Sequence, residues 1–415
     1  MRISNFSNIL FLLVAFPYIS LISTPFDVQP FALILSILFL LLLLTEGNNL
    51  SFPRPLGLIF FIFLYAACLY LFRSNYNYGL RSLAGYASVF FIALASYKTF
   101  RYVSLKTFYF TVFVWVFFGI VQLLFEKTFG NWLLPRMSTS VTRGITSLAP
   151  EPSSYAIICL FLLILNEIFH KDTEHSGKIY FVIMFVLLFQ MVISLSGVGI
   201  LCIFVFFFAK YLSTLVFNRS IKKLLVHSLT AIIPFFVIFL FLYLPVLKNT
   251  RAGRLLTIVV SNPMLLLVDA SVADRVSHIL LSFYSLAYSH GVGLGLGTWN
   301  DYADLLVLSA GGQVANISIH GLSVAGRIMS GWGTAIYELG LIGVLFVLIF
   351  LWIMFIGIYK NKKMKSVYAS SMIILFFTML ISVPLAFPLF GYILGVFLNY
   401  AYVGYKTVSR KEIVV

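Results

Sequence analysis

Apolar stretches about as long as a membrane-spanning helix recur along the whole chain. A helix needs ~20 apolar residues to cross a bilayer. Of 415 residues, 61% are hydrophobic and only 10% are charged. This composition provides more apolar surface than the core of a soluble protein can bury. We therefore expect an all-α, polytopic integral membrane protein with a single domain over residues 1–415. The sequence predicts about twelve spans, near residues 8–24, 30–45, 55–72, 82–97, 107–125, 153–170, 179–195, 198–215, 227–246, 334–358, 366–383 and 386–403.

Basic residues are distributed unevenly between the two sides of this predicted bundle. Lysines concentrate in the short loops of one side, as at Lys210, Lys360, Lys362 and Lys363. Because loops rich in basic residues stay in the cytoplasm, both termini are predicted to be cytoplasmic. The formal net charge of +15 follows from the same pattern, so it does not indicate nucleic-acid binding.

Two long segments, residues 126–152 and 247–333, are predicted on the outer side of the membrane. The longer one contains apolar runs that predict short helices at the membrane surface, forming a cap over the active site. Basic residues in these segments are mainly arginine, whose planar fork matches phosphate better than an ammonium does. We therefore expect an anionic ligand on this side. The arginines concerned are Arg136, Arg143, Arg251, Arg254, Arg275 and Arg327.

Residues 271–290 have the periodicity of an amphipathic helix, with Arg275 on its polar face. Ser271 is the predicted N-cap. Arg275 would then lie in the first turn, where the helix dipole disfavours a cation, so it is a candidate functional residue. The alternatives are an ion pair with Asp274 or Asp269, or a side chain that reaches toward lipid headgroups.

A run of alternating glycines follows at 291–297. Gly291 is predicted to end the preceding helix as its C′ residue. The run neither follows a clear strand nor opens a clear helix, so it does not fit a dinucleotide-binding loop. It either brings backbone close to a ligand or forms a bend. Trp299, Arg254 and His278 are candidates for contacts with a sugar, although an interfacial position is the alternative for the tryptophan.

Three residues are candidates for proton transfer or for an ion pair. Glu151 is flanked by prolines just before a predicted span, which fixes the place of its carboxylate. His320 lies in a glycine-punctuated segment, and a neutral imidazole can remove a hydroxyl proton. Glu338 begins the next predicted span, where a carboxylate is costly unless paired, and Arg327 is its candidate partner.

The sequence contains no Walker loop, no HExxH motif and no cluster of Cys or His with the spacing of metal ligands. Chemistry would then depend on positioning, arginine electrostatics and one general base, without a metal or cofactor.

The order of these features resembles the O-antigen polymerase and ligase superfamily of bacterial envelope proteins, in particular the Wzy-type polysaccharide polymerases. Hydropathy carries the resemblance along the whole chain, and three motifs make it more specific. These are Arg143-Gly144 leading to Glu151-Pro152 and a span, Arg275 followed by the glycines of 291–295, and His320 followed by Glu338-Leu339-Gly340-Leu341-Ile342-Gly343.

This resemblance implies a metal-independent glycosyltransferase with a GT-C-like fold in the bacterial cytoplasmic (inner) membrane. The substrate would be an undecaprenyl-diphosphate-linked oligosaccharide, extended at the outer face. Arg143 and Arg275 would bind the diphosphate, with Arg327 as a third candidate, and His320 would be the base. Glu151 is more typical of polymerases, so the base stays open between His320 and Glu151. Membrane lipids and a chain-length regulator protein are the further candidate partners.

Three other functions remain alternatives. A ligase of the same superfamily would transfer a finished polymer to a different acceptor. A polysaccharide or lipid-linked sugar transporter would also suit twelve spans, but it would be expected to show two matching halves. A cell-wall glycan polymerase of the shape-and-division type fits the order of arginine, glutamate and histidine less well.

Overall fold

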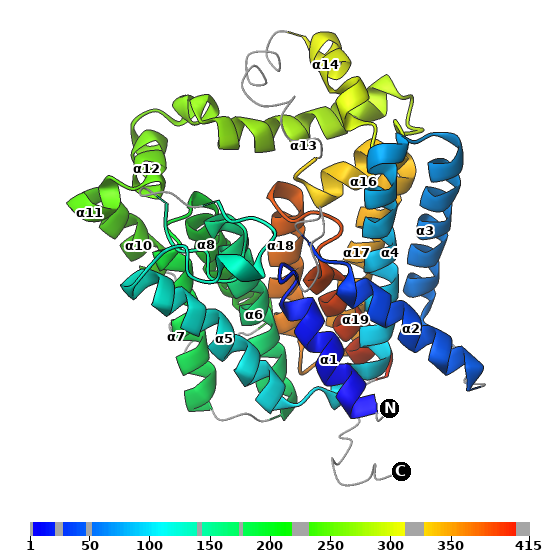
Figure 1. The fold of residues 1–415 in the computed structure, drawn as a ribbon, viewed down its shortest axis with the longest axis horizontal. Coiled ribbons are helices and arrows are strands. Elements are labelled where there is room, and N and C mark those ends of the chain that lie inside the picture. Colours follow the sequence, from blue (N-terminus) through cyan, green and yellow to red (C-terminus); the bar gives the residue numbers. More distant parts are fainter. Residues whose placement is uncertain are drawn as a thin grey trace.

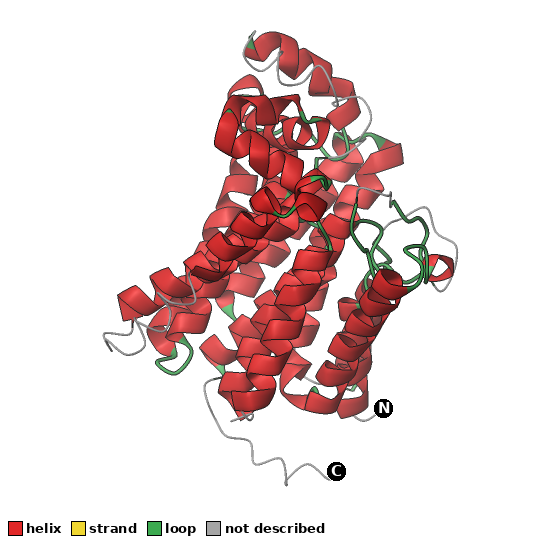
Figure 2. Ribbon diagram, turned by 90° about the vertical axis from the view of Figure 1, so that its left-hand side faces the viewer, coloured by secondary structure: helices red, strands yellow, loops and turns green. Residues whose placement is uncertain are grey.

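The described part of the chain is built of α-helices, as the sequence predicts, and no β-strand occurs within it (Figure 2). A computed structural model describes residues 3–20, 28–46, 52–138, 143–173, 177–217, 232–311 and 328–403. One isolated parallel bridge joins Ser74 to Leu296. The protein is an all-α membrane protein.

The first half of the chain supplies helices on both sides of the bundle (Figure 1). They are α1 (Ile3–Ala15), α2 (Phe31–Thr45), α3 (Arg54–Phe72), α4 (Tyr76–Thr99), α5 (Leu105–Leu124), α6 (Pro152–Thr173), α7 (Gly177–Ile193) and α8 (Gly197–Phe217). Short 3₁₀ turns occupy Phe100–Tyr102 and Asn131–Leu133.

The second half supplies a layer of helices at one end of the molecule and then the last helices of the bundle (Figure 1). They are α10 (Ile232–Tyr243), α11 (Pro245–Lys248), α12 (Arg251–Ser261), α13 (Ala270–Tyr288), α14 (Trp299–Ala310), α16 (Gly331–Leu339), α17 (Leu341–Lys360), α18 (Lys365–Ile381) and α19 (Pro388–Tyr402). A 3₁₀ helix at Pro263–Val268 precedes α13.

Six helices of the described residues are long and apolar enough to cross a membrane, namely α3, α4, α5, α6, α8 and α17. Each predicted apolar stretch contains a helix, but several of these helices are short. The stretch 334–358 is not one helix, because Gly340 adopts a positive φ of 61° and separates α16 from α17. Its membrane-spanning part therefore begins at Leu341, after Glu338.

The centre of the bundle is formed by α6 and α19, which are almost wholly buried. Glycines allow α19 to approach α4 closely. A Cβ at Gly395 would overlap the backbone of Ala93 and the hydroxyl of Ser96. Small residues at such contacts are typical of helix packing within membranes, where helices associate through close contact.

The layer formed by α12, α13 and α14 lies across one end of this bundle (Figure 1). At the opposite end, the beginning of α1 meets the ends of α4 and α19. There the Ser7 hydroxyl donates to the carbonyl of Thr99, and the Asn399 amide donates to the carbonyl of Tyr97. The first and last described helices therefore share one end of the molecule.

α13 turns most of its polar side chains inward and several apolar ones outward, although Leu281 is buried. Ser277, His278 and Ser282 are buried, whereas Leu280 and Phe283 are exposed by 42% and 47%. Such inverted polarity suits a helix whose outer side meets lipid.

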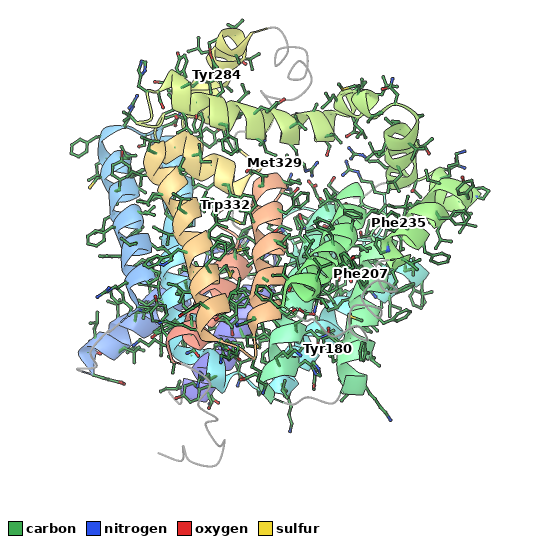
Figure 3. The ribbon with its side chains drawn as sticks, turned by 180° about the vertical axis from the view of Figure 1, so that it is seen from behind. Tyr180, Phe207, Phe235, Tyr284, Met329 and Trp332 are labelled. Atoms are coloured by element: carbon green, nitrogen blue, oxygen red, sulfur yellow. The ribbon has the colours of Figure 1, made fainter. Side chains whose placement is uncertain are left out.

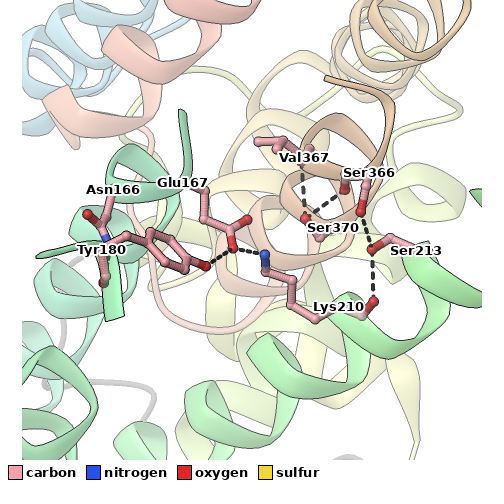
Figure 4. Close-up of polar contacts among 8 residues, drawn as sticks. All are labelled: Asn166, Glu167, Tyr180, Lys210, Ser213, Ser366, Val367 and Ser370. Atoms are coloured by element: carbon pink, nitrogen blue, oxygen red, sulfur yellow. Dashed lines mark hydrogen bonds and ion pairs between the residues drawn. The ribbon is translucent and has the colours of Figure 1, made fainter. Parts of the chain in front are cut away.

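A buried ion pair joins α6 to α8 near the end of the bundle opposite to α13 (Figures 3 and 4). Lys210 contacts Glu167, which also accepts a hydrogen bond of 3.0 Å from the Tyr180 hydroxyl. The prediction that Lys210 is a loop lysine is wrong: it lies within α8 with a partly buried side chain. A charge inside a membrane bundle is stable only when paired, so this contact helps to hold the two helices together.

Candidate functional site

Arg275 lies on the inward side of α13, facing the turn between α18 and α19. Its Nε donates to the Ser382 hydroxyl at 3.0 Å, and its Nη1 donates to the Ser271 carbonyl at 2.7 Å and also contacts the Ser271 hydroxyl. Of the ion pairs formed by described residues, none involves Arg275. Its charge is therefore held by neutral oxygen atoms.

The beginning of α13 explains why no carboxylate pairs with Arg275. The N-cap is Asp269, whose carboxylate accepts from the Val272 amide at 3.2 Å. The same carboxylate pairs with Arg251 at 2.9 Å. The prediction of Ser271 as N-cap is wrong, because the helix starts earlier and Ser271 contacts the arginine instead. Arg275 consequently lies in the second turn of α13, and Asp269 is occupied elsewhere.

Burial is the main influence on the pKa of Arg275 and lowers it, as does the charge of Arg251, whereas the carboxylates of Glu151, Asp269 and Asp274 raise it. A guanidinium nevertheless stays protonated in proteins. Glu151, at the end of the short segment 143–151, is thus one of three carboxylates whose charge acts on Arg275.

A buried glutamine of α5 organises that short segment. The Oε1 of Gln122 accepts from the amides of Thr146 and Ser147 at 3.0 and 2.7 Å. Its Nε2 donates to the carbonyls of Phe129 and Ser147 at 2.7 and 2.9 Å. Gln122 was not singled out from the sequence, although a polar amide near the end of an apolar helix is a signal that could have identified it.

The other support of the short segment is the turn between α7 and α8. Helix α7 ends at Ile193 and α8 begins at Gly197, so residues 194–196 form a tight turn. Gly144 packs directly on this turn, since an added Cβ would overlap the backbone of Ser194.

Glu151 immediately precedes Pro152, the first residue of α6, so its carboxylate lies at the positive end of the helix dipole. Its side chain is 36% exposed and lies 4.0 Å from Arg136. Arg143 is nearby in the same segment: its Nη1 donates to the Ser138 hydroxyl at 3.1 Å, and the Ser138 amide donates to the carbonyl of Pro150 at 2.7 Å.

Of the residues predicted to bind a diphosphate, Arg143 and Arg275 lie in different segments, the short segment 143–151 and α13. No hydrogen bond joins the two arginines, and Glu151 is the predicted residue whose charge acts on Arg275. Arg327 and His320 lie outside the described residues.

His278 is one turn after Arg275 and is fully buried. Its Nδ1 accepts from the amide of Met329, which precedes α16 beneath α13 (Figure 3). Burial, with a smaller contribution from Arg275, lowers the pKa of His278 to about 4. The imidazole is therefore neutral at pH 7, with its proton assigned to Nε2. Its ring meets Trp299 edge to face, with 5.1 Å between ring centroids.

The glycine run after α13 approaches the protein's own backbone. The residue after the C-cap Ser289 is His290, with a φ of 51°, so the prediction of Gly291 at C′ is displaced by one residue. The amide of Gly295 donates to the carbonyl of Glu338 at 3.2 Å, and that of Leu296 donates to the carbonyl of Arg73 at 3.3 Å. The run therefore joins the end of α16 to the turn between α3 and α4.

Glu338 is buried where these segments meet. Its Oε1 accepts from the Ser82 hydroxyl at 2.5 Å and the Gly297 amide at 3.0 Å, and its Oε2 accepts from the Tyr86 hydroxyl at 3.0 Å. Burial raises the pKa of Glu338 to about 7, against these hydrogen bonds. The expected partner Arg327 is not among the described residues, and the donors to Glu338 within the described ranges are all neutral.

The remaining predicted sugar contact, Arg254, is exposed on α12 and stands apart from Trp299 and His278. No group of three or more His, Cys, Asp or Glu in the described ranges could hold a metal ion.

No protein-family model matches the chain, and no curated protein matches it significantly.

Proposed function

We propose that this protein is a Wzy-type polymerase, a glycosyltransferase that joins undecaprenyl-diphosphate-linked repeat units without a metal. In this proposal the helices form about twelve spans of a GT-C-like fold. The reaction takes place at the outer face of the bacterial cytoplasmic membrane, on the side of α12 to α14, and both termini are cytoplasmic.

One observation carries the proposal: Arg275 is a partly buried guanidinium that is held by hydroxyl and carbonyl oxygens and lacks an ion pair among the described residues. Glu151, Asp269 and Asp274 act on it without a direct contact, and a cation removed from water without a paired anion is costly. An anionic ligand at this position would remove that cost, and a diphosphate presents several oxygens to the guanidinium fork.

The reaction assigned to this site is a displacement at an anomeric carbon. The acceptor hydroxyl oxygen forms a bond to this carbon while the bond from the carbon to the lipid diphosphate breaks. Negative charge develops on the leaving phosphate oxygens, where Arg275 and Arg143 stabilise it. The hydroxyl proton passes to a general base. Glu151 is the described candidate for the base and His320 is the other.

The experiment that tests this proposal is chain extension by purified protein. The protein would be incubated with undecaprenyl-diphosphate-linked repeat units from its source cells, and products would be separated by size. We expect a ladder that persists in EDTA. Loss of the ladder in EDTA would contradict metal independence.

Two outcomes would assign a different function. Movement of the substrate across vesicles without new glycosidic bonds would support a transporter. Transfer only when a different acceptor is added would support a ligase.

A further inference from the structure

A cavity of about 270 Å³ lies between α2, α4, α16 and the turn from α18 to α19. Its wall is mainly apolar, but Glu338, Ser82 and Trp299 also line it. A mainly apolar pocket with a few fixed polar groups is the usual form of a small-molecule site. The proposed reaction at Arg275 leaves this cavity without a role.

The hydrogen bonds of Glu338 leave one of its acceptor positions open. An ionised carboxylate offers about four lone pairs. Ser82 and Gly297 fill those of Oε1, and Tyr86 fills one on Oε2. Among the described residues, Oε2 therefore retains one acceptor position.

Trp299 also lines the cavity and has an unpaired donor. Its side chain is 2% exposed, and its indole nitrogen has no hydrogen-bond partner among the described residues. Its ring also packs against Tyr337, another lining residue, with 5.2 Å between centroids. An unpaired buried donor is costly, so a ligand that accepts from it gains affinity. A hydroxyl group both donates and accepts, which matches the open positions of Glu338 and Trp299.

The cavity adjoins the diphosphate site through two elements. The turn that carries Ser382, the partner of Arg275, also supplies Leu385 to the cavity wall. Helix α13 carries both Arg275 and His278, and His278 contacts Trp299. A group in the cavity would therefore be held beside the leaving diphosphate.

We propose that this cavity binds a single sugar ring of the acceptor glycan, with a ring hydroxyl between Glu338 and Trp299. This inference rests on the proposed function, because the acceptor glycan must be held beside the donor's diphosphate for the new bond to form. A lipid tail is the competing occupant, but hydrocarbon would leave the open positions of both side chains unsatisfied.

The test is a direct measurement of binding by purified full-length protein. The probe is the repeat-unit oligosaccharide released from the lipid-linked glycans of the source cells, and undecaprenyl phosphate is the sugar-free comparison. Ala84 lines the cavity, so Ala84→Leu should fill it. We expect this variant to weaken oligosaccharide binding by at least about tenfold.

A matched variant acts as the control. Ala287→Leu adds the same bulk on the exposed face of α13, outside the cavity. It should bind the oligosaccharide nearly as the wild type does. Should Ala84→Leu fail to fold, Ala84→Cys with Cys68→Ala allows the cavity to be blocked after folding, by a methanethiosulfonate reagent.

Unchanged oligosaccharide binding after either blockage would overturn the inference, as would displacement of the oligosaccharide by undecaprenyl phosphate. The polymerase proposal has a separate readout. A ladder without sugar binding in the cavity contradicts this inference alone, and cavity binding without a ladder contradicts the polymerase alone.

Discussion

Two arginines of the same layer differ in whether a direct ion pair neutralises their charge. Arg251 pairs with Asp269, and this pair connects α12 to the beginning of α13. Arg275 donates hydrogen bonds to Ser271 and Ser382, whose neutral oxygens fix its position but do not neutralise its charge. Because a paired guanidinium is already neutralised, only Arg275 offers a preorganised positive charge to a ligand.

The neutral state of His278 leads to a prediction for stability against pH. Its pKa is about 4 in the folded protein and ~6.5 in an unfolded chain, which binds the proton more readily. Stability should therefore be complete above pH 6.5 and fall as the pH is lowered toward 4, by about 3 kcal/mol at most. The unfolding temperature in detergent measures this loss. His278→Asn retains an acceptor for the Met329 amide and should show a smaller loss over the same range. An equal loss in this variant would assign the effect to other groups.

At the scale of elements, the short segment 143–151 is positioned by α5. Both ends of the Gln122 amide bind backbone groups of this segment or its neighbourhood. Glu151 and Arg143 flank the part that Gln122 holds. Their positions therefore depend on a side chain that carries no charge and would touch no substrate.

Gln122→Leu should lower both stability and chain extension. It leaves several buried backbone groups without partners, at roughly 1–3 kcal/mol each. Unfolding temperature and product ladders measure the two effects. Leu123→Ala, at an exposed position of the same helix, is the control and should change neither strongly. Normal chain extension by Gln122→Leu would show that the short segment keeps its place without this residue.

The glycine run positions Glu338 through close backbone contacts. Gly293 has a φ of 87°, and an added Cβ would lie 2.5 Å from the Glu338 carbonyl oxygen. Gly311 has a similar φ of 82° but nothing within 4 Å. Gly311→Ala should therefore cost only backbone strain, of order 1–3 kcal/mol. Gly293→Ala should lower the unfolding temperature further, because it adds a collision. Equal shifts of the unfolding temperature in the two variants would show that the close contact of Gly293 with Glu338 does not contribute to stability.

At the scale of the whole molecule, local composition predicts the helices but not their partners. Apolar runs predicted a helix in each expected stretch, and the prolines that flank Glu151 indicated where the short segment is constrained. Gly340 breaks one predicted span by adopting a positive φ. The sequence did not predict this break, because a single glycine inside an apolar run does not reveal its backbone conformation.

Contacts between residues far apart in sequence were not predictable from one chain. Arg275 meets Ser382, 107 residues later, and Glu338 meets Ser82, 256 residues earlier. Nearby charges in the sequence pointed to Asp274 or Asp269 as partners of Arg275, and to Arg327, outside the described residues, as the partner of Glu338.

The most direct test of the account is chain extension by Arg275→Ala and Arg275→Lys, each purified and assayed with undecaprenyl-diphosphate-linked repeat units. Arg73→Ala, an exposed arginine in the turn between α3 and α4, serves as the matched control. Loss of one well-aimed electrostatic group typically costs ~10²–10³ in rate. We expect Arg275→Ala to lose activity by this factor, Arg275→Lys to recover little of it, and Arg73→Ala to remain active. Full activity of Arg275→Lys would contradict binding by a guanidinium fork, and full activity of Arg275→Ala would contradict the account itself.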